Sequence, residues 1–212
     1  MARHGRLYVI SGPAGVGKSE IVKTVLKNHE DVGLSVSCTT RAPRPGEVDG
    51  VSYHFVTDER FDQLVAEGAF YEWANVHQHR YGTLRSAVRD GLEQGRDLIL
   101  EIDVQGCLQV MRQDPEATSI FVCPPSRENL EKRLRDRGTE TEESIRVRLG
   151  NVAREVATAY HYDYIIVHYD WSEVPDALQI ASEQVYDIIS TRRLERQSSI
   201  EFLDALNQSL NR

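Results

Sequence analysis

The sequence predicts an α/β fold in which a mostly parallel sheet forms the core and helices cover both of its faces. Short apolar runs typical of β-strands alternate with helical patterns along most of the chain, as expected for parallel strands joined by crossover helices. The first run ends at a glycine-rich turn that leads into a helical pattern. From Cys38 to about Gly95 the alternation breaks and aromatic residues become more frequent, which indicates an inserted lobe.

The first half of the chain is expected to contain four strands and three helices. The strands are Arg6–Ser11, Leu34–Ser37, Tyr53–Val56 and Ala69–Val76. The helices run from about Lys18 to Asn28, from Thr57 or Asp58 to Glu67, and from Thr83 to Gln94. Apolar residues recur at helical spacing in the first two, and Thr57 or Asp58 can cap the second.

The second half continues the alternation of strand and helix. The expected strands are Asp97–Asp103, Thr118–Cys123 and Asp163–Val167. Helices are expected up to about Arg112, over Ser126–Arg137 and Glu142–Tyr160, and through most of the remainder. Pro124 and Pro125 stop the second of these strands, because proline cannot donate to a β-ladder.

Composition restricts the class of partner. The 212 residues suit one α/β domain with inserted lobes and can bury a core without disulfides. The net charge of −8, from 25 basic and 33 acidic residues, argues against nucleic acid or an anionic membrane as partner. Three widely spaced cysteines fit reduced thiols, and no apolar run reaches the ~18 residues of a membrane span. We therefore expect a cytoplasmic protein that holds anionic ligands with local basic clusters.

A phosphate-binding loop follows the first strand. GPAGVGKS matches the pattern GxxxxGK[ST] in full. Its residues are the expected contacts to ATP: Gly12, Pro13, Ala14, Gly15, Val16, Gly17, Lys18 and Ser19. The glycines let backbone N–H groups surround phosphate oxygens, Lys18 can reach the β- and γ-phosphates, and the Ser19 hydroxyl can bind Mg²⁺. A glycine-rich turn without ligand is the alternative, but the flanking strand and helix supply the context that the motif needs.

Two carboxylates end the strand-like run DLILEID. Alternation along a strand would place Glu101 and Asp103 on one face. Carboxylates beside such a loop commonly hold Mg²⁺ directly or through water, so Glu101 joins Ser19 as an expected metal contact. The alternative is two solvated charges at a strand end.

A second anion site is expected in the aromatic-rich stretch. Arg41 and Arg44 lie three residues apart on a proline-stiffened loop, and arginine forks match phosphate oxygens in bidentate geometry. Tyr53 and Tyr81 can each add a phenolic hydrogen bond. Together they predict a compact phosphate site, although an arginine pair alone is usually a solvated surface feature.

Glu72 lies inside an otherwise apolar strand, where a carboxylate is costly to bury without hydrogen-bond donors. Guanine offers such donors at N1–H and the 2-amino group, whereas adenine offers neither on that edge. The hydroxyls of Ser37 and Thr83 could bond guanine O6 or N7. A site of this kind would reject bases that lack these donors. Alternatively, Glu72 points outward from an edge strand.

Eight segments, read in order, match a known family: GPAGVGKS, SVSCTTRAPRPGEVDGVSYHF, FYEW, YGT, ILEIDVQG, CPPS, RLRDRGTETEESIRVRL and YDYIIV. In these the chain resembles the guanylate kinases over roughly Arg6 to Tyr186. The resemblance implies a P-loop nucleotide-kinase fold and transfer of the γ-phosphoryl group of ATP to GMP, with Mg²⁺ as cofactor. It also implies a core (1–37, 96–126 and 161–212), an inserted mixed-β GMP-binding lobe (38–95) and a helical lid (127–160).

The resemblance also assigns residues, position by position. The implied GMP contacts are Ser37, Arg41, Arg44, Tyr53, Glu72, Tyr81, Thr83 and Asp103. The implied catalytic residues are Lys18, Arg41, Arg137 and Arg148, with Arg133 as a further candidate. These arginines would neutralise charge that develops on the transferring group. Ion pairing with nearby acidic residues is the alternative for the arginines of the lid.

The chain departs from the family pattern at two places. Glu101 replaces an aspartate of some members, which keeps the charge and adds one methylene. His168 and Tyr169 stand where the family often has Asn and Asp, on the side of the donor base, and leave donor-base selectivity open.

Two other functions and the oligomeric state remain open at this point. A non-catalytic guanylate-kinase-like module would bind phosphorylated partners, but the intact Lys18 and Ser19 argue against it. A kinase of the same fold could act on another phosphorylated small molecule, but Glu72 with Ser37 and Thr83 favours guanine. The chain could be a monomer or a homo-oligomer.

Overall fold

The computed structural model describes residues 4–76, 78–136 and 141–210. The strands are β1 (Leu7–Ser11), β2 (Val32–Leu34), β3 (Cys38–Thr39), β4 (His54–Phe55), β5 (Phe70–Val76), β6 (His79–Leu84), β7 (Asp97–Glu101), β8 (Thr118–Cys123) and β9 (Tyr164–Val167). The helices are α1 (Lys18–Asn28), α2 (Asp58–Ala66), α3 (Arg85–Glu93), α4 (Val104–Gln113), α5 (Arg127–Asp136), α6 (Glu142–Ala157), α7 (Ala177–Arg192) and α8 (Arg196–Leu210), with a 3₁₀ turn at Thr158–His161.

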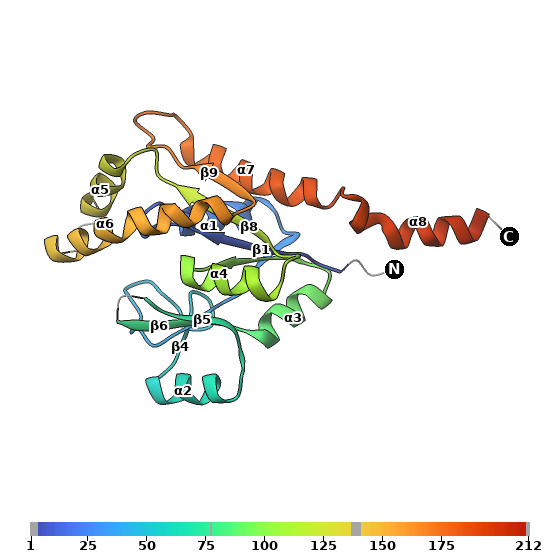
Figure 1. Cartoon of the computed structure of the whole chain (residues 1–212), viewed down its shortest axis with the longest axis horizontal. Helices are drawn as coiled ribbons and strands as arrows, with labels where there is room; N and C mark the ends of the chain where they lie inside the picture. The colour runs from blue at the N-terminus through green and yellow to red at the C-terminus, as the bar shows by residue number, and fades with distance from the viewer. Residues whose placement is uncertain (1–3, 77, 137–140, 211–212) are drawn as a thin grey trace.

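Two sheets organise these elements (Figure 1). The larger sheet is parallel throughout, with the strand order β2-β7-β1-β8-β9. The smaller sheet has the order β4-β3-β6-β5 and mixes parallel with antiparallel pairs. The predicted α/β fold, with a parallel core and an inserted mixed sheet, is confirmed.

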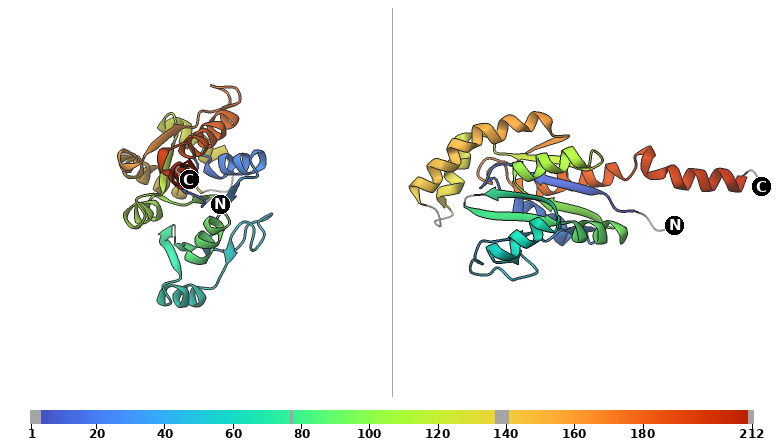
Figure 2. Two further views of the ribbon diagram at one scale, coloured as in Figure 1. Left: turned by 90° about the vertical axis from the view of Figure 1, so that its right-hand side faces the viewer. Right: turned by 60° about the horizontal axis from the view of Figure 1, so that its bottom comes forward.

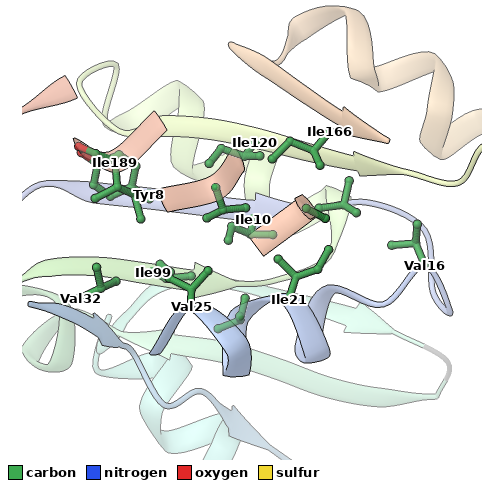
Figure 3. Packing of buried hydrophobic residues seen from close by; sticks show 14 residues of the cluster. Tyr8, Ile10, Val16, Ile21, Val25, Val32, Ile99, Ile120, Ile166 and Ile189 are labelled. Atoms are coloured by element: carbon green, nitrogen blue, oxygen red, sulfur yellow. The ribbon is translucent and has the colours of Figure 1, made fainter. Parts of the chain in front are cut away.

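Helices cover both faces of the larger sheet, and β1 shows how the sequence divides them. Tyr8 and Ile10 are fully buried on one face, among apolar residues of α1 and α7 (Figure 3). Leu7 and Val9 point to the other face, among residues of α3 and α4. Because successive strand residues alternate, an uninterrupted apolar run supplies both layers of the core.

Helix α4 is fastened to strand β5 of the smaller sheet by three glutamine side chains. Their Nε2 atoms donate to β5 carbonyls in three pairs: Gln105 to Asn75, Gln109 to Trp73 and Gln113 to Tyr71. Four helical residues and two strand residues both advance about 6 Å, so the spacings match. This glutamine ladder occupies carbonyls on a strand that is the edge of its sheet.

Two local expectations are wrong. The strand expected at Leu34–Ser37 ends at Leu34, because β2 spans Val32–Leu34. The segment Ser35–Ser37 instead crosses from the larger sheet to the smaller one. Its Ser35 N–H donates to the Ile99 carbonyl of the larger sheet, and its Ser37 carbonyl accepts the His54 N–H of the smaller sheet. Strand β6 was not expected, and Thr83 lies in it, whereas the predicted helix begins only at Arg85. The polar, glycine-containing run HRYGTL forms a strand because it pairs between β3 and β5.

The C-terminal helix α8 extends away from both sheets, with the C-terminus at its far end (Figures 1 and 2). Among the described residues, no helix combines the length and apolarity needed to cross a membrane.

An ion-pair cluster holds the end of α7 against the start of the larger sheet. The Asp97 carboxylate is fully buried and accepts the Arg6 backbone N–H at 2.9 Å and Arg193 Nε at 2.6 Å. Arg193 also pairs with Asp31. A buried carboxylate of this kind is stable only while its donors are in place.

Replacing Asp97 tests this cluster. Asp97→Asn is expected to lower the free energy of unfolding by about 3 kcal/mol, because the Arg193 guanidinium loses its buried counter-charge. Urea denaturation of the two proteins measures the difference. Asp90→Asn is the control, since exposed Asp90 forms an ion pair with its exposed neighbour Arg89 and should change stability by less than ~1 kcal/mol. Equal effects of both substitutions would contradict the prediction.

Candidate active site

The loop between β1 and α1 has the backbone that its glycines allow. Gly12 has φ +138°, and a Cβ there would lie 2.2 Å from the Val122 carbonyl oxygen. Gly17 has φ +99° and is the N-cap of α1, so Lys18 and Ser19 form the first turn of the helix. The N–H groups at the start of a helix favour anions. Lys18 Nζ folds back over the loop and donates to the Gly12 and Pro13 carbonyls at 2.6 and 3.0 Å.

Two side chains contact this loop at the Val16 carbonyl oxygen. His168 Nδ1 and Arg133 Nη1 each lie 2.8 Å from it, and Arg133 Nη2 donates to the His168 carbonyl. Burial, helped by the Arg133 charge, lowers the pKa of His168, so the ring is neutral. His168 Nδ1 also lies 3.1 Å from Arg133 Nη1. A carbonyl only accepts and a guanidinium only donates, so the tautomer of the ring decides which of these two contacts is a hydrogen bond. The Arg133 guanidinium thus donates to two backbone carbonyls, those of Val16 and His168.

The two expected metal contacts meet. Ser19 Oγ donates to Glu101 Oε1 at 2.5 Å, because β7 ends at Glu101 next to the start of α1. The prediction that one strand carries both carboxylates is wrong. Asp103 lies beyond β7 as the N-cap of α4, and its Oδ1 accepts the Gly106 backbone N–H at 2.9 Å.

Glu72, Ser37 and Thr83 come together in the smaller sheet. Glu72 is only 4% exposed, so the alternative of an outward-pointing carboxylate is wrong. Thr83 Oγ1 donates to Glu72 Oε1 at 2.6 Å and lies 3.3 Å from Ser37 Oγ. Burial, together with the nearby Asp103 charge, raises the pKa of Glu72 to about 7, although the Thr83 hydrogen bond opposes the rise. The carboxyl therefore gains or loses its proton near neutral pH.

Arg41 is held by a neighbour that the sequence analysis did not single out. Its Nη1 and Nη2 donate to the two carboxylate oxygens of Glu47 at 2.9 and 2.8 Å, and its Nε donates to Tyr81 Oη at 3.3 Å. Glu47 also accepts the Arg44 backbone N–H at 2.7 Å. The pKa of Glu47 is lowered, chiefly by the Arg41 bonds. The pair fixes the loop that carries both arginines.

One cavity of about 340 Å³ joins the phosphate loop to the Glu72 cluster. The predicted residues that line it are Gly12, Ala14, Gly15, Gly17, Lys18, Ser19, Ser37, Arg44, Tyr53, Glu72, Tyr81, Glu101, Asp103 and Arg148. Those among the described residues that do not line it are Pro13, Val16, Arg41, Thr83 and the further candidate Arg133. Arg137 lies outside the described residues. A second cavity, of about 600 Å³, contains none of the predicted residues among its described lining.

Helix α6 adds two cavity residues that sequence reasoning missed. Asn151 and Glu155 line the cavity beside Arg148, because positions i, i+3 and i+7 share one helix face. Burial raises the pKa of Glu155, while the charges of Lys18 and Arg148 oppose that rise. The sequence did offer a signal for them, because both are polar residues at helical spacing from Arg148.

A phosphate-binding loop on one wall and a buried carboxylate on the other define a P-loop phosphotransferase with a site for a small acceptor. The guanylate kinase family model matches residues 4–185. The chain belongs to the guanylate kinase family.

Named relatives agree over most of the chain. A guanylate kinase of Syntrophotalea carbinolica is 50% identical over 80% of this chain and 81% of its own. One of Alkalilimnicola ehrlichii is 46% identical over 92% and 94%. The crystal structure of guanylate kinase from Anaplasma phagocytophilum is 31% identical, with a TM-score of 0.73 over 92% of this chain and 89% of that one.

The raised pKa of Glu72 predicts a stability that depends on pH. The carboxyl prefers to be neutral in the folded protein, so its favourable contribution is complete below its ordinary pKa of 4.5 and is lost as pH rises through about 7. The difference in unfolding free energy between wild type and Glu72→Gln should therefore change between pH 5 and pH 8, to the disadvantage of wild type at pH 8. Urea denaturation at both pH values measures it, and a constant difference would contradict the prediction.

Proposed function

We propose that this chain transfers the γ-phosphoryl group of ATP to GMP and releases ADP and GDP. The observation that carries the proposal is the single cavity that joins Lys18 and Ser19 of the phosphate loop to the buried Glu72. A donor and an acceptor bound at its two ends would face each other within it. A non-catalytic binding module would not require the phosphate loop, and a sugar phosphate lacks the paired N–H donors that guanine offers to a carboxylate.

Guanine recognition would centre on Glu72. As a carboxylate it can accept from both N1–H and the 2-amino group, while Thr83 donates its one hydroxyl hydrogen to Glu72 and the Ser37 hydroxyl can donate to O6 or N7. Asp103 lines the same cavity and would act nearby. A base without these donors would add nothing to the Thr83 hydrogen bond of the buried carboxylate, which is the source of selectivity.

The GMP phosphate would lie against Arg44, Tyr53 and Tyr81, which line the cavity. Arg41 would contribute from beside it, where Glu47 already holds the guanidinium. Because the loop is fixed before the ligand arrives, less conformational entropy is lost on binding.

The donor phosphates would bind the backbone N–H groups of Gly12–Ser19. Ser19 Oγ and Glu101 Oε1 are oxygen ligands of the kind that Mg²⁺ prefers, and their contact supports a shared metal site. Bound there with the phosphates, Mg²⁺ would neutralise charge on the donor.

Transfer would proceed in line from the donor to the anionic GMP phosphate, which needs no general base and no covalent enzyme intermediate. Lys18 and Arg148 both line the cavity and would stabilise the transferring group, and we assign Arg137 to the same task. On this proposal residues 38–95 form the GMP-binding lobe, 127–160 the lid and the rest the core.

A substrate panel tests the function. Purified protein with ATP and Mg²⁺ is expected to phosphorylate GMP and to leave AMP, CMP, UMP and ribose phosphates almost unused. A coupled assay for ADP measures each rate. Turnover of another acceptor at the rate of GMP would contradict the proposal, and GMP binding without turnover would favour the non-catalytic module.

Glu72→Gln tests the base assignment. The amide loses the charge that strengthens both guanine bonds, so kcat/KM for GMP should fall about 100-fold while the KM for ATP stays the same. Glu59→Gln, an exposed position on α2, is the matched control and should leave both constants unchanged. Loss of activity with unaltered preference for GMP over IMP would show that Glu72 does not read the base.

A further inference from the structure

Helix α4 contains a glycine where its own stability would favour a side chain. Gly106 is buried in the first turn of the helix, and glycine in a helix costs about 1 kcal/mol relative to alanine. An added Cβ would lie 2.3 Å from Glu72 Oε2 and 3.1 Å from Glu72 Cδ. The space of the missing methyl group is therefore filled by the Glu72 carboxylate.

The carboxylate has little freedom to withdraw from that position. Its other oxygen, Oε1, accepts from Thr83 Oγ1 at 2.6 Å on strand β6. Strand β5 itself is tied to α4 by the glutamine ladder, with Gln105 and Gln109 on either side of Gly106 along the chain. The backbone of β5 and the helix thus keep a fixed separation at Glu72.

We propose that Gly106 is a specificity-determining positioning residue for the acceptor base. The absent side chain allows Glu72 Oε2 to pack against α4, and this contact together with the Thr83 hydrogen bond sets the orientation of the carboxylate, which lines the cavity. The inference deepens the proposed function and rests on Glu72 as the guanine acceptor.

A methyl group at position 106 should act on the base and leave the donor unaffected. Gly106→Ala displaces Oε2 from its place and misaligns its bond to guanine, so kcat/KM for GMP is expected to fall about 10- to 100-fold. IMP lacks the 2-amino group and makes one bond fewer, so the preference for GMP over IMP should fall as well. The KM for ATP should remain within about twofold, because no residue of the phosphate loop is among the close contacts of a Cβ at this position.

Steady-state kinetics with GMP and IMP at saturating ATP provide the test. Gly150→Ala is the control, since this glycine also lies in a helix but a Cβ there would meet nothing within 4 Å. The decisive variant is the double substitution Gly106→Ala with Glu72→Asp, in which the shorter carboxylate makes room for the methyl group. The double variant should use GMP better than Glu72→Asp alone.

The GMP to IMP ratios of Gly106→Ala and Glu72→Gln together separate the role of Gly106 from that of the base site. An unchanged GMP to IMP ratio in Gly106→Ala, beside a lowered ratio in Glu72→Gln, overturns the role of Gly106 and leaves the proposed base site intact. An unchanged ratio in both overturns the base site and this inference with it. If Gly106→Ala does not fold, the double variant decides, and activity no better than that of Glu72→Asp overturns the inference.

Discussion

The contact between helix α4 and strand β5 is the constraint on which the rest of the acceptor site depends. Three glutamines one turn apart bond alternate carbonyls of β5, so the helix and the edge strand share one spacing. The N-terminal end of α4 follows β7 of the larger sheet. The same helix thus connects the sheet that carries the phosphate loop to the sheet that carries Glu72. A change in its position would move both ends of the cavity relative to each other.

The ionised form of Glu72 is destabilised by burial, and a ligand that donates hydrogen bonds to it can reverse this effect. Glu72 is buried with one hydroxyl donor, and Asp103 adds a negative charge nearby, so the pKa of the carboxyl rises to about 7. Two donors from a base would favour the ionised form and shift that pKa down again. Binding of such a base therefore releases a proton near neutral pH, whereas a base without donors would gain nothing from the carboxyl. Selectivity and the unusual pKa have the same physical origin.

The features predicted well from sequence were those whose causes are local. The glycines and Lys18 of the phosphate loop determine their own backbone, and α1 begins and ends where the pattern indicates. Glu72 could be singled out because a carboxylate in an apolar strand needs donors, whatever the fold. By contrast β6, a polar run, forms a strand only because two partners flank it. The glutamine ladder was missed because glutamines at helical spacing are equally typical of a solvated face, and no local rule pairs Arg41 with Glu47.

On the donor side, a histidine that departs from the family pattern contacts the phosphate loop. His168 stands where the family often has asparagine, and an amide could also donate to a carbonyl. Here Nδ1 of the ring lies 2.8 Å from the Val16 carbonyl oxygen and 3.1 Å from Arg133 Nη1, and a Cβ at Gly17 would lie 2.6 Å from that nitrogen. The imidazole therefore fits only because Gly17 has no side chain, in the same way that Glu72 fits against Gly106. At both ends of the cavity a glycine makes room for the side chain that sets the geometry, so the small residues of this chain determine where its polar groups act.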